Sequence, residues 1–403
     1  MPNDPTINQG DILVDLVSRY DAVIIQRHYL KPLVYKMKTI CEYLGKPLIL
    51  EFDDDYFHLV PSNPAYFAVG TDQGSYQKYL KLLMDARQQR DVKLFEKAKE
   101  MEPMLEEQRK VGLEEFKEVL SMADAITVST EELAQVYYPY NKNITVFQNN
   151  IDQVYPYRDN YPVTAFVETD ENGHQKIVPS HIMGFSTIPS FEIVKHDGKD
   201  AIRKIPRIGY SCTASHLGED WPTIVGGLAK FSGKHKDDHF YILLGDSDFS
   251  FVESLKDKSR SLIIPATPQY GKYIANMRNI DIALCPLYPN LFNISKSDIK
   301  LVEAGSWGIP GLAPRFVTYS RNFVEEENCL MYSNEDEFVS QLERLHKDIK
   351  VREKIGRAAL EYVYNFRRES LHSERRYEFY KSIIAGKKLL DRYEPNKEKV
   401  NAE

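Results

Sequence analysis

Short apolar runs alternate with amphipathic segments in two separate stretches of the chain, and this alternation constrains the fold more than any other feature. In the first stretch, the segment from Pro32 to Leu44 has apolar residues at helical spacing, and the Gly45-Lys46-Pro47 sequence ends it. The apolar runs of this stretch predict strands at 22–26, 48–52, 125–129 and 144–147. Because a helix between two such strands forms a βαβ unit, we expect these strands to be parallel. A further helix is predicted to begin near Thr130, where a hydroxyl side chain precedes two glutamates.

The second stretch begins at residue 207 and predicts a second parallel sheet. Its apolar runs predict strands at 207–211, 240–244, 261–264, 281–285 and 311–313. Helical segments lie between these runs, which is typical of a doubly wound α/β domain. Two insertions interrupt the alternation. A highly charged segment at about 75–121 has helical periodicity, and the turn signals Asn172-Gly173 and Asp197-Gly198 predict antiparallel hairpins.

These patterns predict an α/β chain with two Rossmann-like, doubly wound domains that face each other across a cleft. The expected parts are an N-terminal domain at 1–155, an inserted antiparallel element at 156–206, a second domain at 207–369, and a C-terminal helix with a polar tail at 370–403. We expect this last part to pack back on the N-terminal domain. Other two-domain α/β proteins, including periplasmic binding proteins, share such a layout, so the fold alone does not decide the function.

Charge and cysteine content narrow the class of protein. The formal net charge of −7 argues against a surface built as a whole for nucleic acid, although it leaves room for a local basic groove. Cys41, Cys212, Cys285 and Cys329 are far apart and form no C-x-x-C pair, which predicts reduced and mostly buried thiols in a cytoplasmic protein. The sequence predicts neither a signal peptide nor a membrane span, because no apolar run is long enough.

The stretch 281–314 carries the clearest functional signal. A strand that ends at Cys285 leads through a loop to a helix expected to begin near Ser297. In open α/β sheets, ligands bind at the carboxyl ends of strands, and the free amides of a helix there can hold a diphosphate. Lys300 and Glu303 share one face of this helix, and a carboxylate can accept two hydrogen bonds from a ribose diol. On spacing alone, a solvated surface pair is the simpler interpretation.

The sequence EAGSWGIP from Glu303 to Pro310 resembles the second half of the donor-binding signature of glycosyltransferase family 4, roughly E-x7-E-A-x-A-x-G-x-P-V. The resemblance implies that Glu303 binds the ribose hydroxyls of a nucleotide sugar. The first glutamate of the signature, which contacts the donor sugar in the family, falls on Ser295. The chain therefore resembles a divergent branch of the family, in which Lys296 and Lys300 surround the phosphates.

Two other segments add to the resemblance. Residues 207–220 are similar to the first strand and loop of the donor domain, which implies that Ser211, Ser215 and His216 lie at the donor phosphates and that His216 is catalytic. A plain strand–turn–helix connection is the alternative. The sequences ADAITVST at 123–130 and VFQNNID at 146–152 resemble the run that closes the acceptor domain in this superfamily. The G-x-G-x-x-G pattern is absent, which argues against a nicotinamide enzyme, and the Walker A pattern is absent as well.

Polar residues also follow the first two predicted strands. Asp53, Asp54 and Asp55 repel one another and need cations, hydrogen-bond donors or water. A D-x-D metal site, an acceptor-side cluster and a structural cap for loop amides are the alternatives; we assign no metal ligands. Arg27 and His28 follow the first strand, and a family histidine on such a loop contacts the donor sugar, with a structural histidine as the equal alternative. We assign Arg27, Asp53 and Asp54 to the acceptor side, and His28, Asp54 and Asp55 to catalysis.

The resemblance implies the GT-B fold and a retaining glycosyltransferase that needs no cofactor. Its donor is expected to be a UDP-sugar, either UDP-glucose or UDP-N-acetylglucosamine. Two acceptors remain open, a cell-envelope glycan and a hydroxymethylated base in phage DNA. A non-catalytic protein that binds sugar nucleotides or carbohydrates is the alternative class, because Ser295 replaces the first glutamate of the signature.

Overall fold

The computed structural model describes residues 9–387 and 391–395, except for 64, 90, 153, 156–164, 170–174, 180–190, 197–198, 205, 213–217, 236–239, 246–260, 266 and 268. The chain divides into two compact units. Unit 1 consists of Met1–Asn149, Asn290–Ser297 and His372–Glu403, and unit 2 consists of Asn150–Pro289 and Asp298–Leu371. Three separate segments of the sequence therefore contribute to unit 1.

Unit 1 is built on a parallel sheet with the strand order β1-β2-β3-β4. The strands are β1 (Val23–Gln26), β2 (Leu48–Phe52), β3 (Ala125–Val128) and β4 (Ile144–Val146). In the register of the sheet, Val23 lies opposite Leu48, and Ile126 lies opposite Ile144. Every residue of β3 is buried, as expected for an inner strand of a parallel sheet covered on both faces. The strands lie where the apolar runs predict them.

Capping residues explain where one helix of unit 1 ends and where another begins. They are α1 (Gln9–Ser18), α2 (Lys31–Leu44), α3 (Gln73–Gln89), α4 (Val92–Met122), α5 (Glu131–Tyr137), α9 (Leu291–Ile294) and α14 (Ser373–Ile384). Helix α2 ends because Gly45 adopts a left-handed conformation with φ 65°. Helix α5 begins after Thr130, whose hydroxyl accepts a hydrogen bond from the amide of Leu133 over 3.2 Å. The predicted helix start near Thr130 is thus confirmed.

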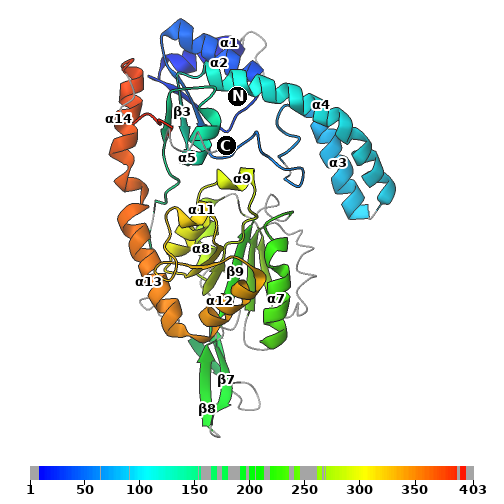
Figure 1. The fold of residues 1–403 in the computed structure, drawn as a ribbon, viewed down its shortest axis with the longest axis vertical. Coiled ribbons are helices and arrows are strands. Elements are labelled where there is room, and N and C mark those ends of the chain that lie inside the picture. Colours follow the sequence, from blue (N-terminus) through cyan, green and yellow to red (C-terminus); the bar gives the residue numbers. More distant parts are fainter. Residues whose placement is uncertain are drawn as a thin grey trace. The chain divides into compact units, whose positions relative to one another are not determined.

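The charged segment after β2 forms α3 and α4, which lie side by side and project from unit 1 (Figure 1). Helix α4 also contributes Phe116 to the core, where its ring centroid lies 5.4 Å from that of Phe52. The loop before α3 approaches α4 closely at two glycines. A Cβ atom added to Gly112 would lie 1.9 Å from the Cα atom of Gly70, so the two backbones touch.

Unit 2 contains a larger parallel sheet with the strand order β11-β10-β9-β12-β13-β14. The strands are β9 (Arg207–Cys212), β10 (Phe240–Gly245), β11 (Ser261–Pro265), β12 (Ile282–Leu284), β13 (Gly311–Pro314) and β14 (Leu330–Tyr332). The sequence analysis predicts the first five of these strands and misses β14. Strands β9, β10 and β11 follow one another toward one edge, and β12 then pairs with the other side of β9. This order is that of a Rossmann-like sheet.

Helices and two hairpins complete unit 2. The helices are α7 (Pro222–Lys234), α8 (Tyr270–Met277), α10 (Ile299–Gly305), α11 (Val317–Ser320), α12 (Glu335–Lys347) and α13 (Ile349–Phe366), followed by a 3-10 turn at Glu369–Leu371. The hairpins pair β5 (Ala165–Thr169) with β6 (Gln175–Pro179) and β7 (Phe191–His196) with β8 (Lys199–Lys204), both antiparallel. The predicted turn residues 172–173 and 197–198 lie outside the described residues. The strands on either side of these turns nevertheless form the two predicted antiparallel hairpins.

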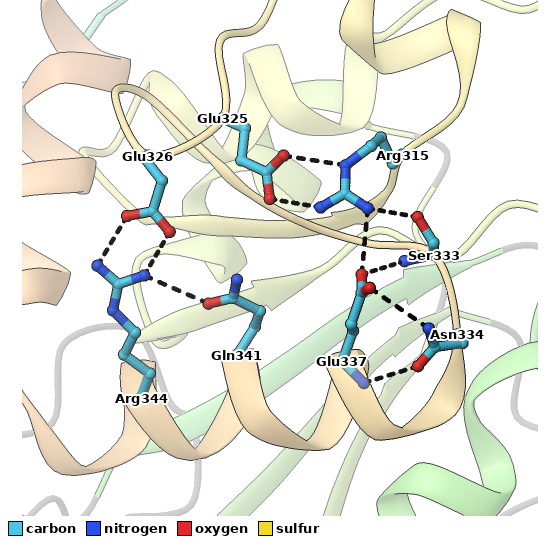
Figure 2. A network of polar contacts seen from close by, with 8 residues as sticks. All are labelled: Arg315, Glu325, Glu326, Ser333, Asn334, Glu337, Gln341 and Arg344. Carbon is cyan, nitrogen blue, oxygen red and sulfur yellow. Dashed lines mark hydrogen bonds and ion pairs between the residues drawn. The ribbon is translucent and has the colours of Figure 1, made fainter.

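Figure 2 shows a polar network that ties the loop after β13 to α12. Arg315 donates two hydrogen bonds to Glu325, over 3.0 and 2.8 Å, and pairs with Glu337 over 3.1 Å. Arg344 makes a second bidentate pair with Glu326. These side chains are between 29% and 48% exposed, so each pair contributes little stability by itself, roughly 0–1 kcal/mol.

Two further sequence predictions concern buried thiols and membrane spans. Cys41, Cys285 and Cys329 are free and buried, and the side chain of Cys212 is outside the described part of the chain. Among the helices in the described ranges, none combines the length and the apolar character needed to cross a membrane.

Candidate functional site

The strand order of unit 2 creates a topological switch point between β9 and β12. The connection from β9 leads to β10 on one side, whereas β12 begins the half of the sheet on the other side. Consecutive crossovers therefore leave the carboxyl ends of β9 and β12 in opposite directions, which opens a crevice there for a ligand. Strand β9 ends at Cys212 and β12 ends at Leu284.

Helix α10 places Glu303 at this region, in a network of hydroxyl groups. The hydroxyl of Tyr273 on α8 donates a hydrogen bond to the Glu303 carboxylate over 2.8 Å. The same hydroxyl lies 2.7 Å from that of Ser211, the penultimate residue of β9. Tyr270, one turn earlier on α8, lies close enough to Glu303 to influence the pKa of its carboxyl. A hydroxyl donor therefore already contacts the carboxylate, and a ribose hydroxyl would supply the same kind of contact.

Burial controls the protonation of Glu303. Only 6% of the residue is exposed, and the resulting loss of hydration raises its pKa to about 7. The hydroxyl groups of Tyr273 and Tyr270 and the charge of Lys300 oppose this rise. The Lys300 ammonium lies 5.2 Å from the ring centroid of Tyr210, close enough for a cation–π interaction. The half-buried Lys300 therefore acts on the Glu303 carboxylate, as expected for two residues on the same face of α10.

The structure brings together some of the predicted donor-side residues. Ser211, Lys300 and Glu303 belong to one network in unit 2. Ser215 and His216 lie outside the described residues. Ser295 and Lys296 belong to the segment grouped with unit 1, so the structure does not join them to the Glu303 network.

The segment that contains Ser295 and Lys296 is anchored within unit 1. The Thr130 hydroxyl donates to the carbonyl oxygen of Ser295 over 2.7 Å, and Ser295 is only 2% exposed. The Lys296 ammonium lies 4.7 Å from the ring centroid of Phe292 on α9. The helix predicted to begin near Ser297 is α10, which begins at Ile299, and the short α9 precedes it.

The sequence analysis missed Tyr270 and Tyr273. Both lie on α8, three residues apart, and therefore point to the same side of that helix. The available signal was the content of 26 tyrosines, which has no positional information. Their contact with Glu303 joins two helices that are far apart in sequence, so spacing alone does not reveal it.

The acceptor-side residues follow neighbouring strands of unit 1. Arg27 comes directly after β1, and its guanidinium pairs with the carboxylate of Asp53, which comes directly after β2. Arg27 has φ 54°, an uncommon conformation for a residue with a side chain and one that often occurs at functional sites. Burial and the neighbouring charge of Asp54 raise the pKa of Asp53, whereas Arg27 opposes the rise.

The two remaining catalytic candidates of unit 1 differ in their surroundings. Burial lowers the pKa of His28, which favours the neutral form of its ring. Asp55 is 1% exposed and accepts hydrogen bonds from the amide of Phe57 over 3.0 Å and from the ring of His58 over 2.6 Å. These contacts match the structural-cap alternative for Asp55. In the described ranges, no three His, Cys, Asp or Glu side chains are placed to hold a metal ion.

Known proteins resemble the chain in part of its sequence and throughout its fold. A model of the glycosyl transferase-like family matches residues 251–381, less than half of the chain. No curated protein matches the sequence. HepE of Anabaena, solved with UDP-glucose, has a TM-score of 0.52 at 11% identity, with 95% of this chain and 84% of HepE covered.

Two other solved structures have similar scores. The sucrose-phosphate synthase of Thermosynechococcus elongatus has a TM-score of 0.52 at 12% identity and covers 94% of this chain and 77% of its own. TarM of S. aureus has a TM-score of 0.53 at 10% identity, with coverages of 93% and 59%. These similarities show that the chain has the GT-B fold, as its sequence predicts. The chain is similar to glycosyltransferases, from which its sequence has diverged.

Proposed function

We propose that the chain is a retaining glycosyltransferase that moves a hexose from UDP-glucose or UDP-N-acetylglucosamine to an acceptor hydroxyl. The observation that carries this proposal is the buried Glu303 carboxylate beside the switch point of unit 2, which accepts a hydrogen bond from the hydroxyl of Tyr273. HepE was solved with UDP-glucose and TarM with UDP, so two proteins of this fold hold the same nucleotide.

In the proposed reaction, Glu303 accepts hydrogen bonds from the ribose hydroxyls. Lys300 and His216 stabilise the negative charge on the departing diphosphate, because a fixed cation is most effective where charge develops. The remaining donor-side residues are Ser211, Ser215, Ser295 and Lys296. The acceptor hydroxyl attacks from the face that the nucleotide leaves, and its proton passes to the leaving phosphate. The nucleotide sugar is the only small molecule that this scheme requires.

On the acceptor side, the proposed residues are Arg27, His28, Asp53 and Asp54. The preferred acceptor is a glycan, because TarM was solved with fondaparinux and α-GlcNAc-glycerol. A hydroxymethylated base in DNA is the second acceptor to test, since the net charge of −7 opposes a duplex more than a neutral saccharide.

The first experiment measures UDP binding by titration calorimetry for the full chain and two variants. Glu303→Ala and Lys300→Ala are each expected to weaken UDP binding at least about tenfold, because each removes a charged partner of the nucleotide. Lys381→Ala is the matched control, because Lys381 is an exposed cation on α14 that pairs with Glu378. Wild-type affinity in both site variants would overturn the donor site.

The second experiment measures UDP release from each UDP-sugar with a panel of glycans and with hydroxymethylated duplex DNA. Release that depends on one acceptor class supports the enzyme and identifies that class. Binding of UDP without release in any arm would support the non-catalytic alternative. Inversion at the anomeric carbon of the product would overturn the retaining scheme.

A further inference from the structure

A pocket of about 340 Å³ lies in unit 1, on the side of the sheet that ends with β4. Its wall combines the start of α5 with a C-terminal segment at 391–395, and we call it the tail pocket. The backbone amide of Tyr393 donates a hydrogen bond to a carbonyl oxygen of β4. Arg375 on α14 pairs with Asp391 over 2.7 Å and donates to the carbonyl oxygen of Val146 over 3.0 Å. The C-terminal segment is therefore fixed beside the sheet.

Carboxylates outnumber cations on the wall of the tail pocket. Among the described residues, four carboxylates and two guanidinium groups line it, and they belong to Glu131, Glu132, Asp391, Glu394, Arg375 and Arg392. One pair joins Arg375 to Asp391 over 2.7 Å, and a second joins Arg392 to Glu394 over 3.2 Å. The wall thus has two more negative than positive charges. Because carboxylate oxygens only accept hydrogen bonds, this wall suits a ligand with several donor groups.

The wall also contains a donor that lacks an acceptor. The Nε atom of Arg392 is buried, and it has no hydrogen-bond partner in the described part of the chain. A buried N–H group without a partner is costly, and an acceptor atom on a ligand removes this cost. The side-chain amide of Gln135 lines the pocket as well, and it both donates and accepts. The ligand that satisfies this wall must therefore accept hydrogen bonds as well as donate them.

Tyr393 gives the wall an aromatic part. Its ring packs edge to face against Tyr138 at the end of α5, with the ring centroids 5.9 Å apart. Burial raises the pKa of the Tyr393 hydroxyl, and the charges of Glu131 and Glu132 raise it further, so this hydroxyl keeps its proton. Pro395 also lines the pocket. The pocket therefore offers apolar ring surface beside its polar groups.

A neutral saccharide matches all three properties. Each of its hydroxyl groups both donates and accepts hydrogen bonds, and the carbon atoms of its rings give it an apolar face. A polyamine would match the excess of carboxylates, but its ammonium groups cannot accept a hydrogen bond from Arg392. A phosphate or sulfate would be repelled by the surplus negative charge.

We propose that the tail pocket is an oligosaccharide-binding subsite of unit 1, separate from Arg27 and Asp53. These two residues follow β1 and β2, whereas Val146 is the last residue of β4. Neighbouring strands of a sheet lie about 5 Å apart, so β2 and β4 end roughly 10 Å apart at the same edge. An oligosaccharide of a few residues spans this distance. Its role as an acceptor rests on the proposed function, whereas its binding involves neither Glu303 nor a nucleotide.

Saturation-transfer NMR measures saccharide binding by the full chain without nucleotide. The probes are maltohexaose, cellohexaose and chitohexaose, and spermidine is the polyamine arm. At least one hexasaccharide is expected to bind with a Kd below about 1 mM. Arg392→Met and Glu131→Ala are each expected to weaken this binding at least about fivefold, because each removes a hydrogen-bonding group of the wall.

Two control variants remove the same chemistry elsewhere on unit 1. Arg19→Met removes an exposed arginine that pairs with Asp15, and Glu107→Ala removes an exposed glutamate that pairs with Lys110. Both are expected to bind the hexasaccharide like wild type. A thermal melt of each variant verifies that it is folded.

The possible outcomes separate the tail pocket from the donor site. The inference is overturned if none of the three hexasaccharides binds, if both pocket variants bind like wild type, or if spermidine alone binds. The pocket variants are expected to bind UDP with wild-type affinity in calorimetry. A chain that binds a hexasaccharide through Arg392 but does not bind UDP would remove the donor site and leave the tail pocket standing.

Discussion

Arg367 and Asp298 form a bidentate ion pair whose side chains are almost entirely buried. The guanidinium donates to the two carboxylate oxygens over 2.8 and 2.7 Å, and the side chains are 1% and 2% exposed. Asp298 is the first residue of unit 2 after the chain leaves Ser297. The guanidinium also donates to the side chain of Asn150, the first residue of unit 2 after Asn149, over 3.3 Å. One side chain therefore anchors two places at which the chain enters unit 2.

Asp298→Asn is expected to destabilise unit 2 strongly. The substitution leaves the Arg367 guanidinium buried without a counter-charge, which typically costs about 3–5 kcal/mol in the free energy of unfolding. Chemical denaturation of the variant and the wild type measures the loss. A companion double variant, Arg367→Met with Asp298→Leu, is expected to recover much of it, because neither buried charge remains.

The control for burial is the bidentate pair between Arg344 and Glu326, which has the same chemistry at the surface (Figure 2). Its side chains are 42% and 48% exposed. Glu326→Gln is expected to change the unfolding free energy by less than about 1 kcal/mol. Equal losses from the buried and the exposed pair would show that burial does not decide the contribution.

Glu303→Gln is expected to change how the stability of unit 2 depends on pH. The folded protein raises the pKa of Glu303 from 4.5 to about 7, so between these values the folded state binds a proton that the unfolded state releases. Stability therefore falls as the pH rises from about 4.5 to about 7, by a total on the order of 3 kcal/mol. The glutamine variant has no such proton and is expected to lack this loss.

Thermal melts of both proteins at pH 5 and pH 8 test this linkage. The variant is expected to be more stable than wild type at pH 8, with a smaller difference at pH 5. If the stabilities of the two proteins changed with pH in the same way, this result would contradict a raised pKa at Glu303. A variant that is more stable but binds UDP poorly would also explain why a buried carboxylate is kept there, since function then requires a group that costs stability.

Gly112→Ala is expected to destabilise unit 1. Its Cβ atom would lie 1.9 Å from the Cα atom and 2.7 Å from the carbonyl oxygen of Gly70, and backbone atoms cannot move aside as a flexible side chain can. Overpacking of this kind costs about 3 kcal/mol or more. Gly233→Ala on α7 is the matched control, because nothing lies within 4 Å of the added atom. That variant is expected to gain roughly 0.5 kcal/mol. A neutral effect at Gly112 would show that α4 can shift away from the loop.

Except for β14, the strands of the two sheets could be predicted from the sequence, because a buried parallel strand is a short run of apolar residues. Gly45 likewise marks the end of α2 by its chemistry alone. The position of Ser295 could not be predicted, because a loop sequence does not specify which unit its backbone contacts. The Tyr273–Glu303 bond also depends on the packing of two helices against a sheet, which spacing within one helix does not encode. The partners of Asp55 are local, yet three adjacent aspartates look alike in sequence.

Asp54→Asn and Asp55→Asn are expected to have different effects, although the two residues are adjacent. Asp55 accepts hydrogen bonds from its own loop, so its variant is expected to lose about 1–2 kcal/mol of stability, as the bond to His58 is weakened.

The side chain of Asp54 has no such role in the loop, although its carbonyl oxygen accepts from Tyr137 over 2.7 Å. Its variant is expected to melt like wild type and bind UDP normally, but to release UDP at least about tenfold more slowly with acceptor, because a carboxylate proposed to position the acceptor hydroxyl is lost. Stability by denaturation, affinity by calorimetry and turnover by UDP release separate the two. If Asp54→Asn has the wild-type turnover rate, Asp54 has no role in catalysis. The pair formed by Arg27 and Asp53 is then the next acceptor-side candidate to test.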